Sequence, residues 1–263
     1  MSFARELELA RRLARRAGEI ALEHSTRGVT ADQKADDSPV TAADRACEAY
    51  IAGALREAFP DDGLLGEEGA RDAGRSGRRW IIDPIDGTRE FLRGIPLWSN
   101  LLALEADGEV VVGVCNLAAL GEMYWAARGQ GAWMERGAET KPTRLAVSTI
   151  DRRDRAVVCL STFGSLARHP LKDRALEYLA TAWSVRSISG CYEAMLVASG
   201  RAEAWIELSA ASWDLCALQV IAEEAGARFF NFDGGRSPHA GNCVICAPGL
   251  EAELRALVDP GNG

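Results

Sequence analysis

The chain has 263 residues, of which 48% are hydrophobic and 26% are charged, and its formal net charge is −8. This length and composition predict a globular protein with one sizeable unit or two closely packed halves, and they argue against a disordered chain. The acidic balance and the lack of a block of lysine and arginine argue against a nucleic-acid-binding protein, and an acidic protein would repel a phosphorylated substrate unless bound cations reversed the local field.

The first half of the chain begins with two helices, predicted over residues 4–23 and 41–59 from apolar side chains at helical spacing. Thr41 and Asp44 form the T-x-x-D start that is typical of a helix cap. We expect a polar surface loop over 71–79. Short β-like runs separated by turn signals then predict a meandering, largely antiparallel sheet, with strands at 80–83, 99–106, 109–116, 122–128 and 131–135 and the tightest hairpin cue at 107–109.

The second half of the chain alternates strands with helices. Strands are predicted at 156–161, 202–208, 227–232 and 243–247, and helices near 173–182 and 190–200, over 212–226 and at the C-terminal end. This alternation is typical of a layered α/β unit. It predicts a boundary near residue 150, with an N-terminal α+β half over 1–150 and a C-terminal α/β half over 151–263.

The seven cysteines form an odd set in a chain that is too long to need disulfide staples, so we expect reduced and mostly buried thiols. Cys243 and Cys246 have redox spacing, but they lie in an apolar run that predicts a strand, and we interpret them as two half-buried structural thiols. The N-terminus has no apolar signal region, and the longest apolar runs are far shorter than the ~20 residues that cross a bilayer. We therefore expect a cytoplasmic protein that binds no membrane.

Several familiar catalytic motifs are absent from the sequence. It has no G-x-S-x-G elbow, no phosphate-binding G-x-x-x-x-G-K-[ST] loop and no H-E-x-x-H motif. Its three histidines do not lie in acid-rich stretches. These absences argue against a histidine-based triad and against a zinc site.

The segment WIIDPIDGTREF, residues 80–91, places two carboxylates at the end of a predicted strand. Asp83 and Asp86 could converge on one hard cation, with the carbonyl of Ile85 as a third oxygen ligand. Oxygen ligands without histidine or thiolate favour Mg²⁺. A competing interpretation is that the two acids belong to a strand-end turn and a helix cap.

Other residues favour the metal site over the turn. The amides of Gly87 and Thr88 would point at an anion beside the metal if a helix starts there. Glu67 follows an apolar pair, and Asp214 lies at the start of an apolar helix. Four or five oxygens suit a centre in which two cations ~4 Å apart clamp the attacking and leaving oxygens of a phosphoryl displacement.

Four motifs occur in a fixed order along almost the whole chain: Lys34 with SPVTAAD (38–44), GEE (66–68), WIIDPIDGTREF (80–91) and SWD (212–214). In this order they resemble the inositol monophosphatase family of Mg²⁺-dependent, Li⁺-sensitive phosphatases. The resemblance implies an α/β fold, the layered αβαβα sandwich of the inositol monophosphatase/fructose-1,6-bisphosphatase type. It also implies a homodimer that hydrolyses small phosphomonoesters with two or three Mg²⁺ per active site.

The resemblance also implies roles for individual residues. The implied metal ligands are oxygen donors, namely Glu67, Asp83, the Ile85 carbonyl, Asp86 and Asp214. Thr88 with Asp44 would orient and deprotonate the attacking water, with Glu67 as a further catalytic residue. The amides of Gly87 and Thr88 would receive the phosphate. Most of the implied metal ligands thus fall in the N-terminal half.

Four residues have two possible interpretations. Asp44 can be the N3 partner of a capping box as well as a catalytic residue, because one carboxylate can do both. Lys34 is either a solvated surface charge or a contact to phosphate or to a loop carboxylate. We expect Glu68 to face solvent or support the site rather than bind metal, because adjacent side chains seldom point the same way. Glu207 would meet substrate hydroxyls in inositol phosphatases, and otherwise it is a strand-end charge.

The middle of the chain and the segment GCYEAMLVASG, residues 190–200, resemble the histidinol-phosphate phosphatase branch, so we expect histidinol phosphate as the substrate. Gly190 stands where that branch is expected to have an aspartate, and Glu193 or Glu207 could compensate for it. Expected substrate contacts are therefore Gly190, Cys191, Glu193 and Glu207. The alternatives are an inositol-1-phosphate phosphatase, a nucleoside 3′,5′-bisphosphate phosphatase, and a non-catalytic sensor of metal or phosphate, against which the complete ligand set argues.

Overall fold

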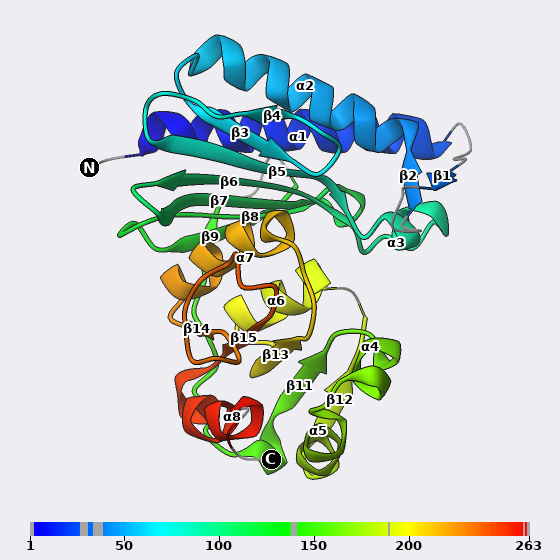
Figure 1. The fold of residues 1–263 in the computed structure, drawn as a ribbon, viewed down its shortest axis with the longest axis vertical. Helices are drawn as coiled ribbons and strands as arrows, with labels where there is room; N and C mark the ends of the chain where they lie inside the picture. Colours follow the sequence, from blue (N-terminus) through cyan, green and yellow to red (C-terminus); the bar gives the residue numbers. More distant parts are fainter. Residues whose placement is uncertain are drawn as a thin grey trace.

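The structure is a computed structural model that describes residues 3–26, 31–33, 39–137, 141–188, 190–259 and 261. Helices and sheets alternate in layers along the long axis of the molecule (Figure 1). The outer layer holds α1 (Ala4–Thr26) and α2 (Ala42–Ala58), and the middle layer holds α6 (Gly190–Ala198) and α7 (Ser212–Glu224). The remaining longer helices, α5 (Lys172–Leu179) and α8 (Glu251–Val258), lie beyond the second sheet. This order confirms the predicted αβαβα sandwich.

An eight-stranded sheet lies between the outer and middle helices, in the order β10-β9-β8-β7-β6-β5-β3-β4. Its strands are β3 (Gly63–Gly66), β4 (Arg71–Asp72), β5 (Arg78–Asp86), β6 (Ser99–Ala106), β7 (Glu109–Leu117), β8 (Glu122–Ala127), β9 (Ala132–Arg136) and β10 (Thr143–Arg144). Strands β5 to β10 form the predicted antiparallel meander, whereas β3 pairs with β5 in parallel. The predicted hairpin is confirmed, because Asp107 and Gly108 both have positive φ, of 53° and 79°, as a two-residue turn of this kind requires.

The predicted loop over 71–79 was wrong at both of its ends. Residues Arg71 and Asp72 form β4, which pairs with β3 at the edge of the sheet, and β5 already begins at Arg78. An edge strand exposes its side chains to solvent, so a polar sequence does not exclude it. Charge alone therefore could not separate this edge strand from a loop.

A five-stranded sheet follows, in the order β12-β11-β13-β15-β14. Its strands are β11 (Val157–Leu160), β12 (Ser184–Arg186), β13 (Ala204–Glu207), β14 (Arg228–Phe230) and β15 (Cys243–Cys246). The four predicted strands of this half are confirmed, and the three-residue β12 and the short α4 (Phe163–Arg168) were missed because neither is long enough to show a period. The division of the chain near residue 150 stays a prediction.

Three further short elements lie next to predicted site residues along the chain. They are β1 (Ala31–Gln33), its antiparallel partner β2 (Pro39–Thr41), and α3 (Thr88–Leu92). Strand β2 leads directly into α2, and Thr41 and Asp44 form a complete capping box at that junction. The predicted cap is therefore confirmed.

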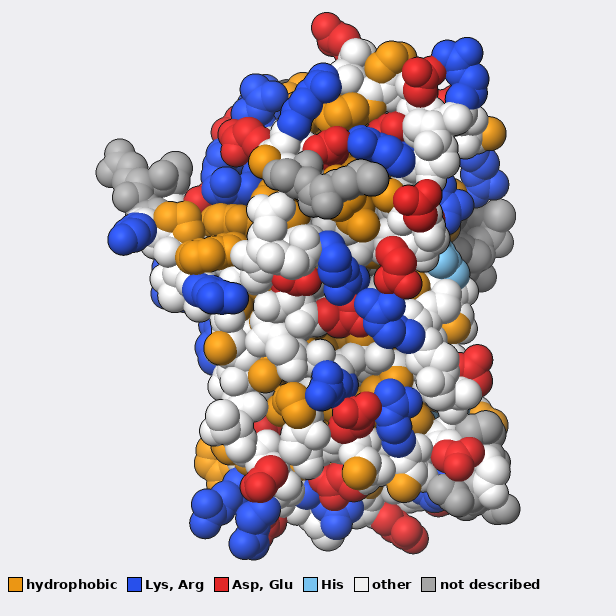
Figure 2. Space-filling view, turned by 90° about the vertical axis from the view of Figure 1, so that its left-hand side faces the viewer, with side chains coloured by type: hydrophobic (Ala, Val, Ile, Leu, Met, Phe, Trp, Pro, Cys, Tyr) orange, Lys and Arg blue, Asp and Glu red, His pale blue; other side chains and the backbone are white. Residues whose placement is uncertain are grey.

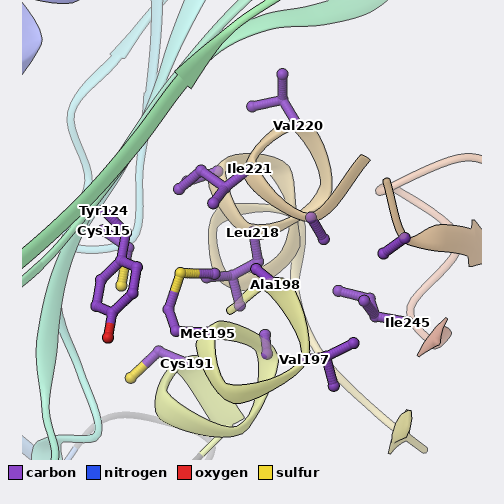
Figure 3. Packing of buried hydrophobic residues seen from close by; sticks show 14 of the residues in the cluster. Cys115, Tyr124, Cys191, Met195, Val197, Ala198, Leu218, Val220, Ile221 and Ile245 are labelled. Atoms are coloured by element: carbon purple, nitrogen blue, oxygen red, sulfur yellow. The ribbon is translucent and has the colours of Figure 1, made fainter. Parts of the chain in front are cut away.

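Apolar clusters fill the spaces between the layers. One cluster packs α1 and α2 against the large sheet, a second surrounds α6 and α7, and a third packs the small sheet against α5 and α8. Because side chains alternate along a strand, Ile81 of β5 joins the middle cluster while Trp80 and Ile82 join the outer one. Figure 3 shows Met195 of α6 and Ile221 of α7 in the middle cluster, facing the large sheet.

All seven cysteines are buried and unbridged. Cys243 and Cys246 are fully buried rather than half-buried, because they lie on a central strand and pack into clusters on opposite faces of the small sheet. Two thiols on opposite faces cannot form a local disulfide. Their structural interpretation therefore stands.

The surface carries charges of both signs. On the face in Figure 2, Lys and Arg side chains are interspersed with Asp and Glu side chains. Within the described part of the chain, no helix combines the length and the apolar character needed to cross a membrane.

Candidate active site

Asp83 and Asp86 lie on β5 on either side of an irregularity in its pairing with β6. Asp83 is opposite Leu101 and Asp86 is opposite Ser99, so three steps along β5 match two steps along β6. In a regular strand, residues three apart point to opposite faces, and the extra residue of a bulge brings them to the same side. The strand therefore continues past its predicted end at Asp83, and the bulge lets the two carboxylates converge.

Asp214 joins these two carboxylates from the other end of the sequence. Asp83, Asp86 and Asp214 each offer one oxygen, and these oxygens all lie within 4.8 Å of one another. Asp214 lies in the first turn of α7, where its Oδ2 accepts a hydrogen bond of 2.7 Å from the amide of Ala211. The structure thus assembles the predicted cluster from two distant segments.

Helix α7 can approach the large sheet because Gly113 has no side chain. A Cβ added at Gly113 would lie 2.5 Å from Cγ1 of Val220 and 2.6 Å from the carbonyl oxygen of Ala217, both on α7. These distances are too short for carbon contacts. The glycine on β7 therefore lets α7 sit close enough to deliver Asp214 to the end of β5.

The cluster is electrostatically unfavourable without a cation. Asp83 is 2% exposed, and its Oδ1 has no hydrogen-bond partner among the described residues. Burial raises the pKa of Asp83 well above its ordinary value, and the negative charges of its neighbours add to the effect. Burial, followed by the charge of Asp214, raises the pKa of Asp86 to about 7. An orphaned carboxylate oxygen among hard oxygen donors fits a divalent cation such as Mg²⁺.

Glu67 reaches the cluster from the loop that follows β3. Its charge contributes to the raised pKa of Asp83, and its amide donates to the carbonyl of Ile82 at 3.2 Å. Glu68 is the next residue on this loop, but it is not among the described residues that line the cavity. The structure therefore brings Glu67 to the other acids and leaves Glu68 beside the site.

Glu48 of α2 holds the loop that carries Glu67, and the sequence analysis missed it. Its two carboxylate oxygens accept hydrogen bonds from the amides of Glu68 at 2.8 Å and Ala70 at 2.7 Å. A Cβ at Gly66 would lie 2.3 Å from Oε2 of Glu48, so the glycine leaves room for this carboxylate. A single acid on an amphipathic helix carries no sequence signal that it is buried.

Thr88 and Asp44 meet where α3 passes α2. The Thr88 hydroxyl lies 3.2 Å from the carbonyl oxygen of Ile85 and 3.5 Å from Oδ1 of Asp44. The other oxygen of Asp44, Oδ2, accepts from the amide of Thr41 at 2.7 Å in the capping box. Asp44 can therefore serve both of its predicted roles, because each role uses a different oxygen.

Gly87 allows the chain to turn from β5 into α3. Its φ is 87°, in the left-handed region, and an added Cβ would lie 3.1 Å from the carbonyl oxygen of Leu97. Helix α3 has only five residues. An anion beside it would therefore meet individual amides rather than the field of a long helix.

A cavity of about 370 Å³ joins these groups. Seven acids line it among the described residues: Glu67, Asp83, Asp86, Glu90, Glu193, Glu207 and Asp214. The other predicted site residues that line it are Ile85, Gly87, Thr88, Gly190 and Cys191. Asp44 lies behind Thr88, and Lys34 falls outside the described residues.

Comparison with known proteins identifies the fold and the chemistry. The Inositol monophosphatase family model matches residues 4–259. The chain is 38% identical over 257 residues to a histidinol-phosphatase of Mycobacterium tuberculosis, covering 97% of this chain and 98% of that protein. It is 40% identical over 243 residues to a histidinol-phosphatase of Chlorobaculum parvum, covering 92% of each. The structure matches that of an IMPase of Thermotoga maritima with a TM-score of 0.86 at 27% identity over 96% of each chain. The chain belongs to the inositol monophosphatase family and is a phosphoric monoester hydrolase.

Proposed function

We propose that this phosphomonoesterase hydrolyses histidinol phosphate with Mg²⁺ as its cofactor. The observation that carries the proposal is one cavity with two acidic regions. Asp83, Asp86 and Asp214 suit cations that would bind the phosphate, whereas Glu193 and Glu207 would face the alcohol. Because histidinol carries an amino group and an imidazole, it suits the second region, and the name of the relatives at 38% and 40% identity supports this choice.

Five groups would hold two or three Mg²⁺ per site, and all of them are oxygen donors: the carboxylates of Glu67, Asp83, Asp86 and Asp214, and the carbonyl of Ile85. When bound, the cations lower the pKa of water and stabilise negative charge on the departing alkoxide. The amides of Gly87 and Thr88 would receive the phosphate oxygens.

Thr88 would orient the attacking water. Asp44 does not line the cavity, so in this proposal it acts through the Thr88 hydroxyl, which lies 3.5 Å from its Oδ1. When Thr88 donates its proton toward Asp44, its oxygen can accept a proton from water. Burial raises the pKa of Asp44, which helps this carboxylate to hold the proton that the relay delivers.

The test is phosphate release from histidinol phosphate, inositol 1-phosphate, fructose 1,6-bisphosphate and adenosine 3′,5′-bisphosphate, each with and without Mg²⁺. We expect the highest kcat/KM with histidinol phosphate, strict dependence on Mg²⁺, and inhibition by Li⁺ that competes for the cation site. A preference for inositol 1-phosphate, or a flat profile, would overturn the proposed substrate. Insensitivity to Li⁺ at high concentration would count against the family mechanism.

We also propose that the protein acts as a homodimer in the cytoplasm. Seven buried, unbridged thiols are consistent with a reducing compartment. The dimer rests on the family resemblance. Sedimentation equilibrium should give twice the 28.3 kDa mass of one chain, and a single-chain mass at micromolar concentration would contradict it.

A further inference from the structure

We propose that Glu193, Trp205 and Glu207 form a subsite for a cationic group on the alcohol of the substrate, which takes over the role of the acid missing at Gly190. We call these three residues the cation subsite. The inference rests on the proposed function for the identity of the alcohol, but the charge that it selects can be tested separately.

Gly190 and Trp205 depend on each other sterically. A Cβ added at Gly190 would lie 3.2 Å from Cζ2 of Trp205 and 3.9 Å from Oε2 of Glu207. An aspartate at position 190 would therefore push its side chain against the indole ring. The ring would have to shift by a few tenths of an ångström to admit that side chain, whereas Glu193 and Glu207 already supply negative charge from neighbouring positions.

Glu193 provides one such charge from the first turn of α6. It is 1% exposed, it lines the cavity, and its Oε1 accepts a hydrogen bond of 2.7 Å from the amide of Ile188. This bond fixes the carboxylate on one side. Because α6 has about three to four residues per turn, Glu193 lies one turn beyond Gly190 on the same side of the helix.

Trp205 adds a polar group that lacks a partner. Its side chain is 1% exposed and lines the cavity, and Nε1 makes no hydrogen bond with the described residues. The indole N–H is nevertheless close enough to the Glu193 carboxyl to lower its pKa against the larger effect of burial, which raises it. A buried donor without a partner costs free energy. A ligand with both an acceptor and a donor, such as the imidazole of histidinol with its two ring nitrogens, can satisfy it and Glu193 together.

Glu207 provides the second charge, from the end of β13. Its Oε1 accepts a hydrogen bond of 3.0 Å from the amide of Ser209, and its charge raises the pKa of Glu193. Arg89 is the one basic side chain among the described residues that line the cavity, and it belongs to α3, next in sequence to Gly87 and Thr88, whose amides would receive the phosphate. Two buried carboxylates without a local cation favour a cationic ligand and disfavour a neutral polyol.

The test compares Glu193→Gln with wild type on two classes of substrate. Glutamine keeps an oxygen that can accept from Ile188, and it removes the charge. With histidinol phosphate and with phosphoethanolamine, we expect KM to rise about tenfold or more while kcat changes little. With glycerol 2-phosphate, whose alcohol is neutral, we expect KM and kcat to stay within about twofold of wild type. Glu177→Gln is the control, because Glu177 is exposed on α5 and its loss removes the same charge from the chain.

The outcomes separate this inference from the proposed function. Equal losses on cationic and neutral substrates would assign Glu193 a structural role and overturn the subsite, as would an unchanged KM for both cationic substrates. Wild type could instead show no activity on histidinol phosphate but a higher kcat/KM for phosphoethanolamine than for glycerol 2-phosphate. If Glu193→Gln then abolishes that difference in kcat/KM, the subsite is supported and the proposed substrate is wrong.

A second set of variants keeps the inference testable if Glu193→Gln folds poorly. Trp205→Phe removes the indole N–H and should raise KM for histidinol phosphate, whose imidazole can accept from it, but not for phosphoethanolamine, whose ammonium has no acceptor. An unchanged KM for histidinol phosphate would overturn the role of Trp205 in the subsite. Gly190→Asp in the otherwise unchanged chain should lose activity on both classes and regain part of it when combined with Trp205→Phe, because phenylalanine keeps an aromatic ring in the core but lacks the Cζ2 atom that crowds position 190. Failure of Trp205→Phe to rescue Gly190→Asp would overturn the steric argument.

Discussion

The side-chain amide of Asn100 donates a hydrogen bond of 2.6 Å to the carbonyl oxygen of Pro84. Pro84 lies in the bulge between the two carboxylates of β5, and a proline has no N–H with which to bind the neighbouring strand. Asn116 then donates to Oδ1 of Asn100 at 3.0 Å and to the carbonyl of Ala14 in α1 at 2.8 Å. A buried polar chain therefore connects α1 with the backbone that positions the metal ligands.

Replacement of Asn100 by alanine should weaken both the fold and the site. The change removes the side-chain donor from the carbonyl of Pro84 and one of the two acceptors of the Asn116 amide, which keeps the carbonyl of Ala14, so we expect a loss of about 1–3 kcal/mol in the free energy of unfolding. We also expect a higher Mg²⁺ concentration for half-maximal activity, because the bulge is held less firmly. Urea unfolding and Mg²⁺ titration of activity measure the two effects, and a variant that loses stability but titrates like wild type would argue that the bulge is fixed by other contacts.

Asp86→Asn should abolish turnover and stabilise the metal-free protein at pH 8. The folded-state pKa of Asp86 is raised to about 7, mainly by burial, so at pH 8 the metal-free fold must hold a disfavoured negative charge, which asparagine lacks. We expect a higher Tm than wild type in EDTA and a smaller rise in Tm on adding Mg²⁺. Asp214→Asn should also abolish turnover. Near-wild-type rates for either variant at saturating Mg²⁺ would contradict the ligand assignment.

Stability should depend on pH through Glu193. Its pKa is raised from 4.5 to about 7 by burial, so its neutral form favours folding below pH 4.5, and this contribution is lost as pH rises through 7. The glutamine in Glu193→Gln does not titrate, so the variant does not lose this contribution. Its free energy of unfolding minus that of wild type should therefore increase by about 1–3 kcal/mol between pH 5 and pH 8. Chemical denaturation of both proteins at several pH values measures the difference. A difference that is constant across this range would mean that Glu193 stays charged in the fold.

Thr88 offers a matched pair of variants. Thr88→Ala removes the hydroxyl that links Asp44 to the cavity, so we expect kcat to fall about 100-fold or more, with a smaller change in KM. Thr88→Ser keeps the hydroxyl and should retain most of the rate. Steady-state kinetics with saturating Mg²⁺ measures both variants, and equal losses in the two would show that the methyl group, rather than the hydroxyl, is what the site requires.

The parts of the fold that the sequence predicted correctly depend on neighbouring residues. The helix over 4–23, the capping box of Thr41 and Asp44, and the turn at Asp107 and Gly108 all follow from local spacing and backbone preference. The parts that it missed depend on distant partners. Strand β12 is short, and the edge strand β4 is polar, so neither carries a local signal.

By itself, the sequence determined the family, the layered fold and six of the seven acids that line the cavity, because the ordered motifs can be read along the chain; it missed Glu90. Only the tertiary structure decided how those acids converge and what supports them. The bulge on β5 depends on its register with β6, and the burial of Glu48 depends on the loop after β3. The lack of a side chain at Gly190 is explained by the closeness of Trp205. Each is a contact between residues far apart in sequence, and the free energy of such a contact depends on distance and burial, which no local pattern of residues specifies.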